Sequence, residues 1–240
     1  MGMRNGVVVM KTDKQSPAFA RNVARRTRRA GRAYVMCSPL NGSTDVRFES
    51  RLELAVAQLL ELDPRVNGYR AQPYTLSFEM ELDGVVKRRL YTPDFELEVG
   101  GITVVIEVKP QRWVDEHAAL FARAQSELLK SGKRFLVVTE QSFTGHVQRN
   151  VEVLLGFYTQ ARACLQDWAA PLLLKGADEL SGHVSRVTHC DLPSNYVAAA
   201  GVLLGILRFD MTNDLFETMD FDVWPTQGAL CCFEVLSYEQ

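Results

Sequence analysis

The sequence predicts an α/β fold in which helices flank a mixed β-sheet, with a small and mostly helical second domain behind it. Residues 91–110 read as two strands joined by Gly100-Gly101, a pair suited to a two-residue hairpin turn. The chain then continues as strand, helix and strand: a hydrophobic strand that ends at Val108, an amphipathic stretch over 113–129, and the run RFLVVTE. That order favours a right-handed parallel crossover.

Length and composition set the outer limits. The chain has 240 residues, of which 47% are hydrophobic, so it can bury a catalytic core and a small companion. We therefore expect one domain over 1–145 and another over 146–240. The net charge of −2 argues against a nucleic-acid binder that is basic over its whole surface. Any affinity for DNA must therefore come from local basic patches.

The five cysteines are odd in number and lack paired C-x-x-C spacing, which predicts reduced and mostly buried thiols rather than zinc ligands. No apolar run has the length of a membrane span or the form of a signal peptide. The expected compartment is the cytoplasm.

The N-terminal region is basic. The stretch PAFARNVARRTRRAGR, residues 17–32, has helical propensity, and its arginines suit a phosphate-contacting arm because guanidinium pairs with phosphate in a planar fork. A solvated charged helix is the alternative. The arginines predicted to bind DNA are Arg21, Arg25, Arg26, Arg28 and Arg29. Residues 33–46 read as a loop that leads into a helix.

The stretch ESRLELAVAQLLELDP predicts that helix, because its apolar residues recur at helical spacing and it stops before Pro64. Glu53 lies at the border of the apolar stripe. It is either part of a capping box with Ser50 or a metal-site carboxylate, and the spacing alone does not separate these roles. Glu49, one turn earlier, competes for either.

Residues 69–82 read as extended, and Asp83-Gly84 predicts a hairpin turn into VVKRRLYTPDF, so the central strand pair is expected to join a longer meander. Three consecutive cations, Lys87, Arg88 and Arg89, alternate between the two faces of this hairpin. They either contact DNA or form an ordinary polar surface.

Counting back from the Gly100-Gly101 turn sorts the side chains of the hairpin. One face is apolar, and on the other Asp94 lies opposite Glu107, with Lys109 on the same side. Opposed carboxylates repel, and a divalent cation with oxygen ligands would suit their spacing. The alternative is an ordinary edge hairpin on which Lys109 neutralises solvated acids. The interior character of VVIEVK argues against that alternative.

The second domain is predicted to begin with a helix over 147–168 and to continue in short helical pieces. The segment from Ser194 reads as helix, turn and helix, with Thr212 or Asn213 as an N-cap. The tail, with Trp224-Pro225, Gly228 and ALCCFEVL, reads as a β wing. This suggests a winged-helix unit. Its second helix, MTNDLFETMDFD, is acidic, which favours protein docking over DNA readout, with a simple lid as the alternative.

Pro93-Asp94 followed by Glu107-Val108-Lys109 resembles the PD-(D/E)XK nuclease motif. The chain is similar to TnsA, the endonuclease subunit of heteromeric Tns-type transposons. The motifs that carry this resemblance are SRLELAVAQLLELDP, the AQP of residues 71–73, YTPDFELEV and IEVKP. The resemblance covers residues 47–139, with a looser echo over 194–216. Several motifs in one order are more specific than the nuclease signature alone.

The resemblance implies a restriction-endonuclease-like fold and a Mg²⁺-dependent cut in double-stranded DNA near the 5′ ends of a transposon, with Mn²⁺ as a substitute metal. It also implies two partners. A TnsB-like DDE transposase cuts the 3′ ends, and a TnsC-like AAA+ regulator docks on the C-terminal domain. Such a subunit would work in the bacterial cytoplasm, at the nucleoid, and not at a membrane.

By position, the resemblance assigns catalysis to Glu53, Asp94, Glu107 and Lys109. The metal ligands would be Glu53, Asp94, Glu107 and the backbone carbonyl of Val108. Some family members have glutamine in place of Glu107, so this chain is nearer to the general nuclease pattern. A stand-alone PD-(D/E)XK restriction or resolving enzyme and a catalytically silent assembly adaptor are the alternatives.

Overall fold

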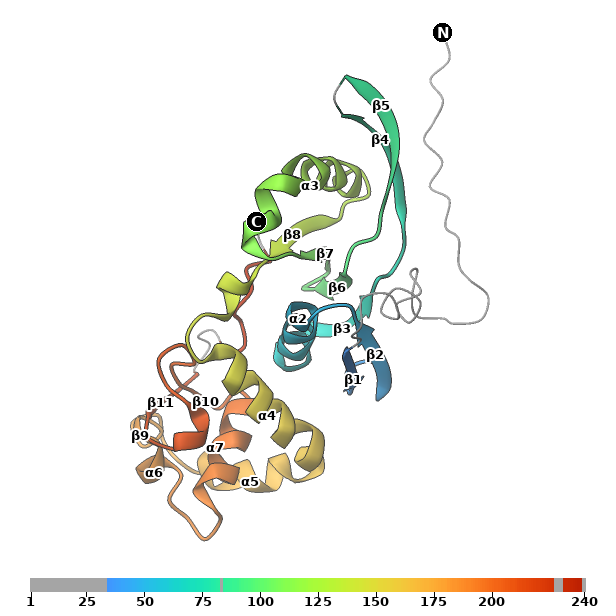
Figure 1. Ribbon diagram of the computed structural model, residues 1–240. Helices are drawn as coiled ribbons and strands as arrows, with labels where there is room; N and C mark the ends of the chain where they lie inside the picture. The colour runs from blue at the N-terminus through green and yellow to red at the C-terminus, as the bar shows by residue number, and fades with distance from the viewer. Residues whose placement is uncertain (1–33, 83, 227–230, 239–240) are drawn as a thin grey trace. The chain divides into compact units, whose positions relative to one another are not determined.

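The computed structural model describes residues 34–82, 84–226 and 231–238 (Figure 1). The described residues divide into two compact units. Residues 34–56, 66–140 and Tyr238 form the first unit, and residues 57–65 and 141–237 form the second. The predicted basic arm, Arg21 to Arg32, lies outside the described residues.

A four-stranded mixed sheet forms the centre of the first unit. Its strands are β3 (Val66–Ala71), β6 (Phe95–Val99), β7 (Ile102–Val108) and β8 (Arg134–Val138), in the spatial order β3-β6-β7-β8. Strand β6 pairs antiparallel with β3 and β7, and β7 pairs parallel with β8. The predicted turn is confirmed, because Gly100 and Gly101 have φ angles of 57° and 81° and Val99 faces Ile102.

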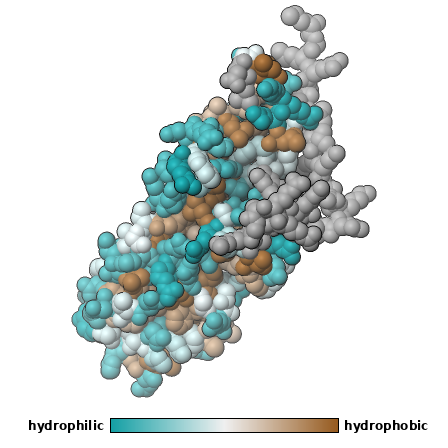
Figure 2. Space-filling model, viewed as in Figure 1, coloured by the Kyte–Doolittle hydropathy of each residue, from teal (hydrophilic) through white to brown (hydrophobic). Residues whose placement is uncertain are grey.

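The strands before the sheet differ from the predicted meander. Strands β4 (Leu76–Leu82) and β5 (Val85–Tyr91) form a hairpin with Gly84 at φ 74°, but this hairpin is a separate two-stranded sheet. In Figure 1 it extends beyond helix α3 as a long ribbon. Figure 2 shows hydrophobic residues beside hydrophilic ones toward its free end.

Helix α3 (Val114–Leu129), which follows the short 3-10 helix η1 (Gln111–Trp113), is confirmed as the crossover between β7 and β8. Gly132, at φ 71°, lies in the turn beyond the helix. The core between α3, the sheet and the base of the β4–β5 hairpin contains Phe78, Tyr91, Val105, Phe121, Ala124, Leu128 and Phe135.

Residues 33–46 were expected to form a loop, and this was wrong for the described part. Strands β1 (Tyr34–Ser38) and β2 (Thr44–Phe48) pair as an antiparallel hairpin, with Gly42 at φ 70° in its turn. The predicted helix that follows is confirmed as α2 (Arg51–Leu62), whose periodic apolar residues Ala55, Val56, Leu59 and Leu60 are buried.

The second unit is mostly helical. Its helices are α4 (Val147–Ala161), α5 (Leu165–Leu173), α6 (Val184–Val187) and α7 (Ser194–Leu203), with a 3-10 turn, η3 (Arg162–Cys164), between the first two. Strands β9 (Gly182–His183), β10 (Leu207–Arg208) and β11 (Asp222–Pro225) form a small sheet in the order β10-β11-β9. The 3-10 helices η2 (Glu140–Phe143) and η4 (Phe216–Thr218) complete the described elements.

The helix predicted to start near Thr212 does not form. The Asp210 side chain instead accepts hydrogen bonds from the backbone N–H groups of Thr212 (2.9 Å) and Asn213 (3.1 Å). The buried amide of Asn150 on α4 donates to the carbonyls of Met211 and Asp214 and accepts from the N–H of Phe216. These bonds fix the segment as a loop. Of the predicted β wing, Trp224 and Pro225 lie in β11, residues 227–230 lie outside the described residues, and residues 231–238 contain no strand.

All five cysteines are free thiols, but the expected burial is wrong, because Cys37 and Cys164 are exposed and the other three are half-buried. No helix in the described ranges has both the length and the apolar character needed to cross a membrane.

Candidate functional site

Asp94 lies immediately before strand β6, at the end of the β6–β7 pair. The ladder ends at Phe95 and Ile106, so Asp94 is not itself a ladder partner of Glu107. Its N–H donates to the carbonyl of Ile106 (3.1 Å), and its Oδ2 accepts from the N–H of Val108 (2.8 Å). The side chain is thereby fixed beside the end of β7, next to Glu107.

Glu107, on the central strand β7, is buried with both carboxylate oxygens engaged. Oε2 accepts a hydrogen bond from the hydroxyl of Tyr91 (2.7 Å), and Oε1 lies 2.9 Å from Nζ of Lys109. Lys109 keeps 24% of its side chain exposed, so this ammonium group reaches both the carboxylate and solvent. The predicted placement of Lys109 and Glu107 on one side of the strand is consistent with this ion pair.

Glu53 sits in the first turn of α2. Its N–H donates to Ser50 Oγ (3.1 Å), and its Oε2 accepts from the N–H of Glu49 (2.9 Å). The second bond reaches one residue further back than a capping box requires. The cap therefore exists, but it leaves Glu53 close enough to the strand acids to respond to their charge.

The three acids influence one another. Burial, followed by the negative charges of Glu107 and Glu53, raises the pKa of Asp94 well above its ordinary value, although the Val108 N–H and Lys109 oppose this. Burial, with smaller contributions from the charges of Glu49 and Glu107, also raises the pKa of Glu53. Burial and mutual repulsion thus disfavour the simultaneous ionisation of these carboxyl groups.

Tyr91 belongs to this site, and the sequence did not identify it. Burial and then the charge of Glu107 raise the pKa of its hydroxyl well above the ordinary 10.0, so the group stays protonated and donates to Glu107. Tyr91 also packs against Phe78 and Phe135. An aromatic residue at the end of a strand predicts only packing, and its hydroxyl partner appears only in the folded chain.

Gln72 is a second neighbour that the sequence did not reveal as unusual. Its N–H donates to the carbonyl of Asp94 (2.8 Å), it has φ 46°, and only 2% of the residue is exposed. Among the described residues, its side-chain Nε2 and Oε1 have no hydrogen-bond partner. A buried unpaired amide in a left-handed conformation is costly, and such costs gather near functional sites.

The donor set suits a hard cation, but it is small. Within the ranges that the structure describes, no group of three or more histidine, cysteine, aspartate or glutamate side chains is arranged to hold a metal ion. Mg²⁺ commonly uses only one or two carboxylates and takes water or phosphate oxygens for its other positions. Asp94 and Glu107, with the carbonyl of Val108, fit that smaller requirement.

His117, on the helix near the site, could serve as a catalytic base by residue type, but among the described residues it forms no hydrogen bond to the carboxylates. Its Nδ1 lies 3.0 Å from the carbonyl of Trp113, and its ring stacks on Phe121 of the same helix. These contacts favour its structural role over that of a catalytic base.

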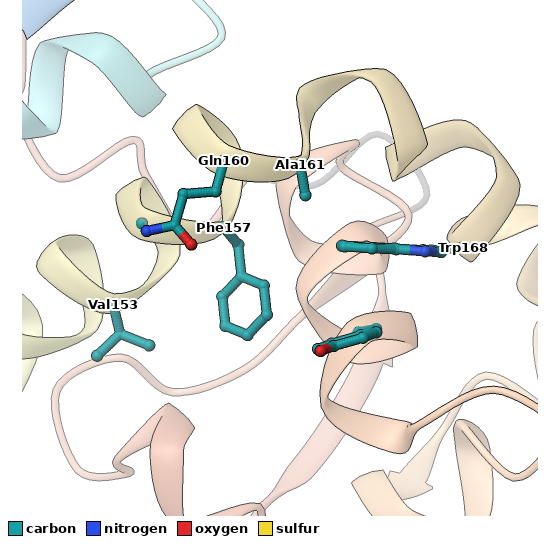
Figure 3. Close-up of a pocket in the computed structure, with 7 residues that line it drawn as sticks. Val153, Phe157, Gln160, Ala161 and Trp168 are labelled. Carbon is teal, nitrogen blue, oxygen red and sulfur yellow. The ribbon is translucent and has the colours of Figure 1, made fainter.

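The second unit contains a hollow of about 380 Å³ between α4, α5 and α7 (Figure 3). Its lining includes Val153, Phe157, Gln160, Ala161, Trp168 and Tyr196. The rings of Trp168 and Tyr196 stack at 4.6 Å. With apolar walls, one amide and no ionisable lining group besides the tyrosine hydroxyl, this hollow suits binding of an apolar group rather than catalysis.

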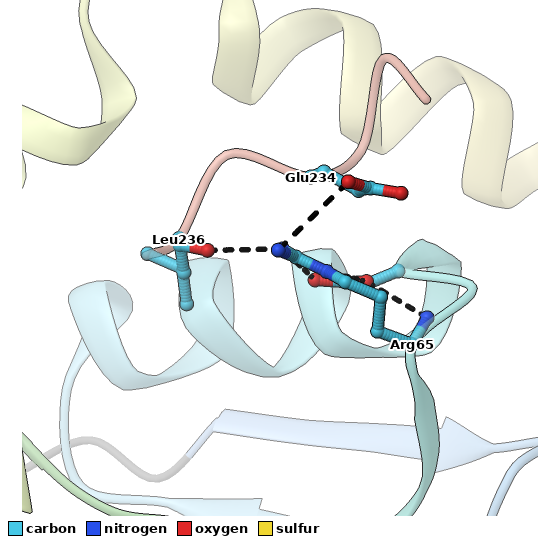
Figure 4. Close-up of polar contacts among 4 residues, drawn as sticks. Arg65, Glu234 and Leu236 are labelled. Carbon is cyan, nitrogen blue, oxygen red and sulfur yellow. Dashed lines mark hydrogen bonds and ion pairs between the residues drawn. The ribbon is translucent and has the colours of Figure 1, made fainter. Parts of the chain in front are cut away.

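The second unit also contains a buried ion pair with a structural role (Figure 4). Arg65 donates to both carboxylate oxygens of buried Asp63, at 2.9 and 2.8 Å, and to the carbonyl of Leu236 at 2.9 Å. Glu234 lies 3.9 Å from the same guanidinium. These bonds attach the C-terminal segment to the residues after α2, and every acid in the group faces a cation.

No protein-family model matches the chain, and no curated protein matches it.

Proposed function

We propose that this chain is a metal-dependent DNA endonuclease whose site comprises Asp94, Glu107, Lys109 and Glu53. The observation that carries the proposal is the pairing of two buried carboxylates at the ends of adjoining strands, with one lysine on the second carboxylate at 2.9 Å. Burying carboxylates without enough positive charge lowers the stability of the fold. Such an arrangement is typical of a functional site, where a bound cation neutralises the carboxylates and positions a phosphodiester.

Asp94, Glu107 and the Val108 carbonyl would hold Mg²⁺, which would supply Lewis-acid stabilisation of charge on the scissile phosphate. Mn²⁺ is expected to substitute. Lys109 would then be released from Glu107 to orient the attacking water and stabilise the transition state. Glu53 would accept a hydrogen bond from water on the side of α2. Tyr91 keeps the Glu107 carboxylate in place through its hydroxyl.

The test is cleavage of supercoiled plasmid and of a labelled duplex with Mg²⁺, with Mn²⁺ and with EDTA, by the chain alone and together with a DDE transposase from the same element. Asp94→Ala and Lys109→Ala should each lose about a thousandfold or more in rate, as expected when several kcal/mol of transition-state stabilisation disappear. Glu98→Ala is the matched control, because this exposed acid lies on β6 away from the site. Full activity in either site variant would refute the assignment.

Within this proposal, the chain acts as the TnsA-like subunit of a transposase and cuts near the 5′ ends of the element. A DDE transposase would supply the 3′ cuts, and an AAA+ regulator would dock on the second unit. The apolar hollow beside Trp168 offers such a partner a place for a hydrophobic side chain. This docking role would hold for the second unit even though its predicted second helix is absent.

The partners separate the proposal from its alternatives. A transposase subunit should be nearly inert alone and should cut when a DDE transposase from the same element is added. A restriction or resolving enzyme would cut without it. Calorimetric titration with Mg²⁺ tests the silent adaptor. A chain that neither binds the metal nor cuts DNA, with or without the transposase, would be such an adaptor.

A further inference from the structure

The β4–β5 hairpin has one anchored end and one free end. At its base, Phe78 and Tyr91 are buried in the core against α3. Farther out, all six residues from Val85 to Leu90 are exposed. The described chain provides no third strand to this pair and no helix over its outer part (Figure 1). Its outer part therefore has a large surface available to a partner.

The charges on the hairpin are sorted between its two faces. In the register, Lys87 pairs with Met80 and Arg89 pairs with Phe78, so these two cations share a face with apolar residues. The hairpin acids Glu79 and Glu81 lie on the other face, where Glu79 is the cross-strand partner of Arg88. One face thus carries Lys87 and Arg89 beside apolar residues whose inner members pack against α3, while the other face carries Arg88 and the two acids.

The two cations on that face are free, whereas the third cation is engaged. Arg88 donates from Nε to the hydroxyl of Ser77 at 2.6 Å. Neither Lys87 nor Arg89 forms an ion pair with any part of the chain that the structure describes. Residues two apart on a strand lie about 7 Å from one another, so these side chains present two separate positive charges.

The same strand leads into the candidate site. Strand β5 ends at Tyr91, whose hydroxyl binds Glu107, and Asp94 follows three residues later. Lys87 is therefore at most about 25 Å from Asp94 along the chain. A DNA duplex advances about 3.4 Å per base pair, so a duplex at the site could meet the hairpin about seven base pairs away at most.

We propose that the Lys87 and Arg89 face of the β4–β5 hairpin contacts the phosphate backbone of double-stranded DNA beside the cutting site. This inference rests on the proposed function for the identity of the nucleic acid. A polyanion is favoured over a protein partner because, among the described hairpin residues, the face offers two cations without ion pairs and no acid. The contact adds affinity and positions the duplex, without reading its sequence.

The test is the salt dependence of duplex binding by the full chain, measured by fluorescence anisotropy in EDTA between 50 and 200 mM NaCl. Each lost phosphate contact should reduce the slope of log K against log salt by about 0.9. Lys87→Ala/Arg89→Ala should therefore lower the slope by about 1.8, so that the ratio of wild-type to variant affinity falls about twelvefold between 50 and 200 mM. Arg88→Ala, on the same strand but the other face, should leave the slope unchanged.

Parallel salt plots for the wild-type chain and the double variant would overturn the inference, as would an equal effect of Arg88→Ala. A wild-type chain that does not bind the duplex would overturn it too. The outcome for the proposed function is separate. Binding with the expected slope change but no metal-dependent cutting, with the transposase present, would refute the endonuclease and keep the DNA-contacting face. Cutting with an unchanged slope would refute the face alone.

Discussion

Asp94 and Glu96 are both buried acids at the start of strand β6, and their surroundings are opposite. Glu96 forms ion pairs with Arg70 and Lys133, and Lys133 also donates to the hydroxyl of Tyr74. Burial acts to raise the pKa of Glu96, but hydrogen bonds from Lys133, Tyr74 and Arg70 outweigh it and lower the pKa below the ordinary value. Asp94, in contrast, faces two other acids, and its pKa is raised.

The difference shows how a structural acid and a candidate functional acid can lie two residues apart at the beginning of one strand. A buried carboxylate with two cations holds elements together, because Glu96 connects β3 to the segment before β8. A buried carboxylate beside other carboxylates weakens the fold until something positive arrives. Burial alone therefore does not distinguish the two roles, whereas the sign of the surrounding charge does.

The largest effect on stability is expected from Glu96→Gln. The substitution leaves the half-buried Lys133 without its anionic partner and should lower the free energy of unfolding by about 2 to 3 kcal/mol. Urea denaturation measures this, with Glu98→Gln as a control that should change it by less than about 0.5 kcal/mol. A loss no greater than that of the control would show that Glu96 is not the structural member of the pair.

Asp94→Asn should act in the opposite direction. The amide oxygen can still accept from the Val108 N–H, while the repulsion from Glu107 and Glu53 is removed. We expect the free energy of unfolding at pH 7 to rise by about 1 kcal/mol, as is common when a strained functional group is neutralised, while cleavage is lost. A less stable Asp94→Asn protein would contradict the electrostatic account of the site.

The pH dependence of stability should sharpen the contrast. The native pKa of Glu96 is below its ordinary 4.5, so its contribution is present above pH 4.5 and disappears as the pH falls through the native pKa. The native pKa of Asp94 is above its ordinary 3.8, so its penalty is absent below pH 3.8 and grows as the pH rises. The extra stability of Asp94→Asn over the wild-type chain should therefore vanish in acid. Urea titrations at several pH values measure this, and extra stability that persists below pH 3.8 would contradict the account.

Tyr91→Phe should have no greater effect on stability than Asp94→Asn, and in the opposite direction. It removes one hydroxyl that donates to Glu107 and should cost about 1 kcal/mol of stability. If Tyr91 positions Glu107, the apparent affinity for Mg²⁺ should also fall, by roughly tenfold. Tyr74→Phe, whose hydroxyl contacts Lys133 and Glu96, is the matched control and should not alter metal affinity. Equal metal affinities in both variants would limit Tyr91 to packing.

The sequence predicted the parts of the fold that local rules determine. The glycine pair gave the β6–β7 turn, apolar spacing gave α2 and α3, and the hydrophobic run to Val108 gave the interior strand. The β1–β2 hairpin was missed although Asn41-Gly42 is a hairpin signal between two alternating segments. The turn formers Pro39, Asn41-Gly42 and Ser43 favour a loop in the sequence, whereas in the structure they connect two strands of five residues each.

The remaining errors have tertiary causes. The helix near Thr212 fails because Asn150, far away in sequence, binds the backbone of that segment. Asp94 lies outside the ladder because its carboxylate binds the Val108 N–H, a contact that no strand alternation predicts. The register was extended one residue too far for the same reason, although it correctly brought the two acids into one neighbourhood.

The order in which the site assembles follows from the Gly100-Gly101 turn. Asp94, Glu107 and Lys109 belong to one hairpin whose ends meet by closing a short loop, a step that takes microseconds in isolated hairpins. Glu53 comes from a helix far earlier in the chain, and its arrival requires a much longer loop to close. The strand acids should therefore come together early in folding and the helix acid late. The three acids therefore come close to one another only in the last stage of folding, when Glu53 reaches Asp94 and Glu107.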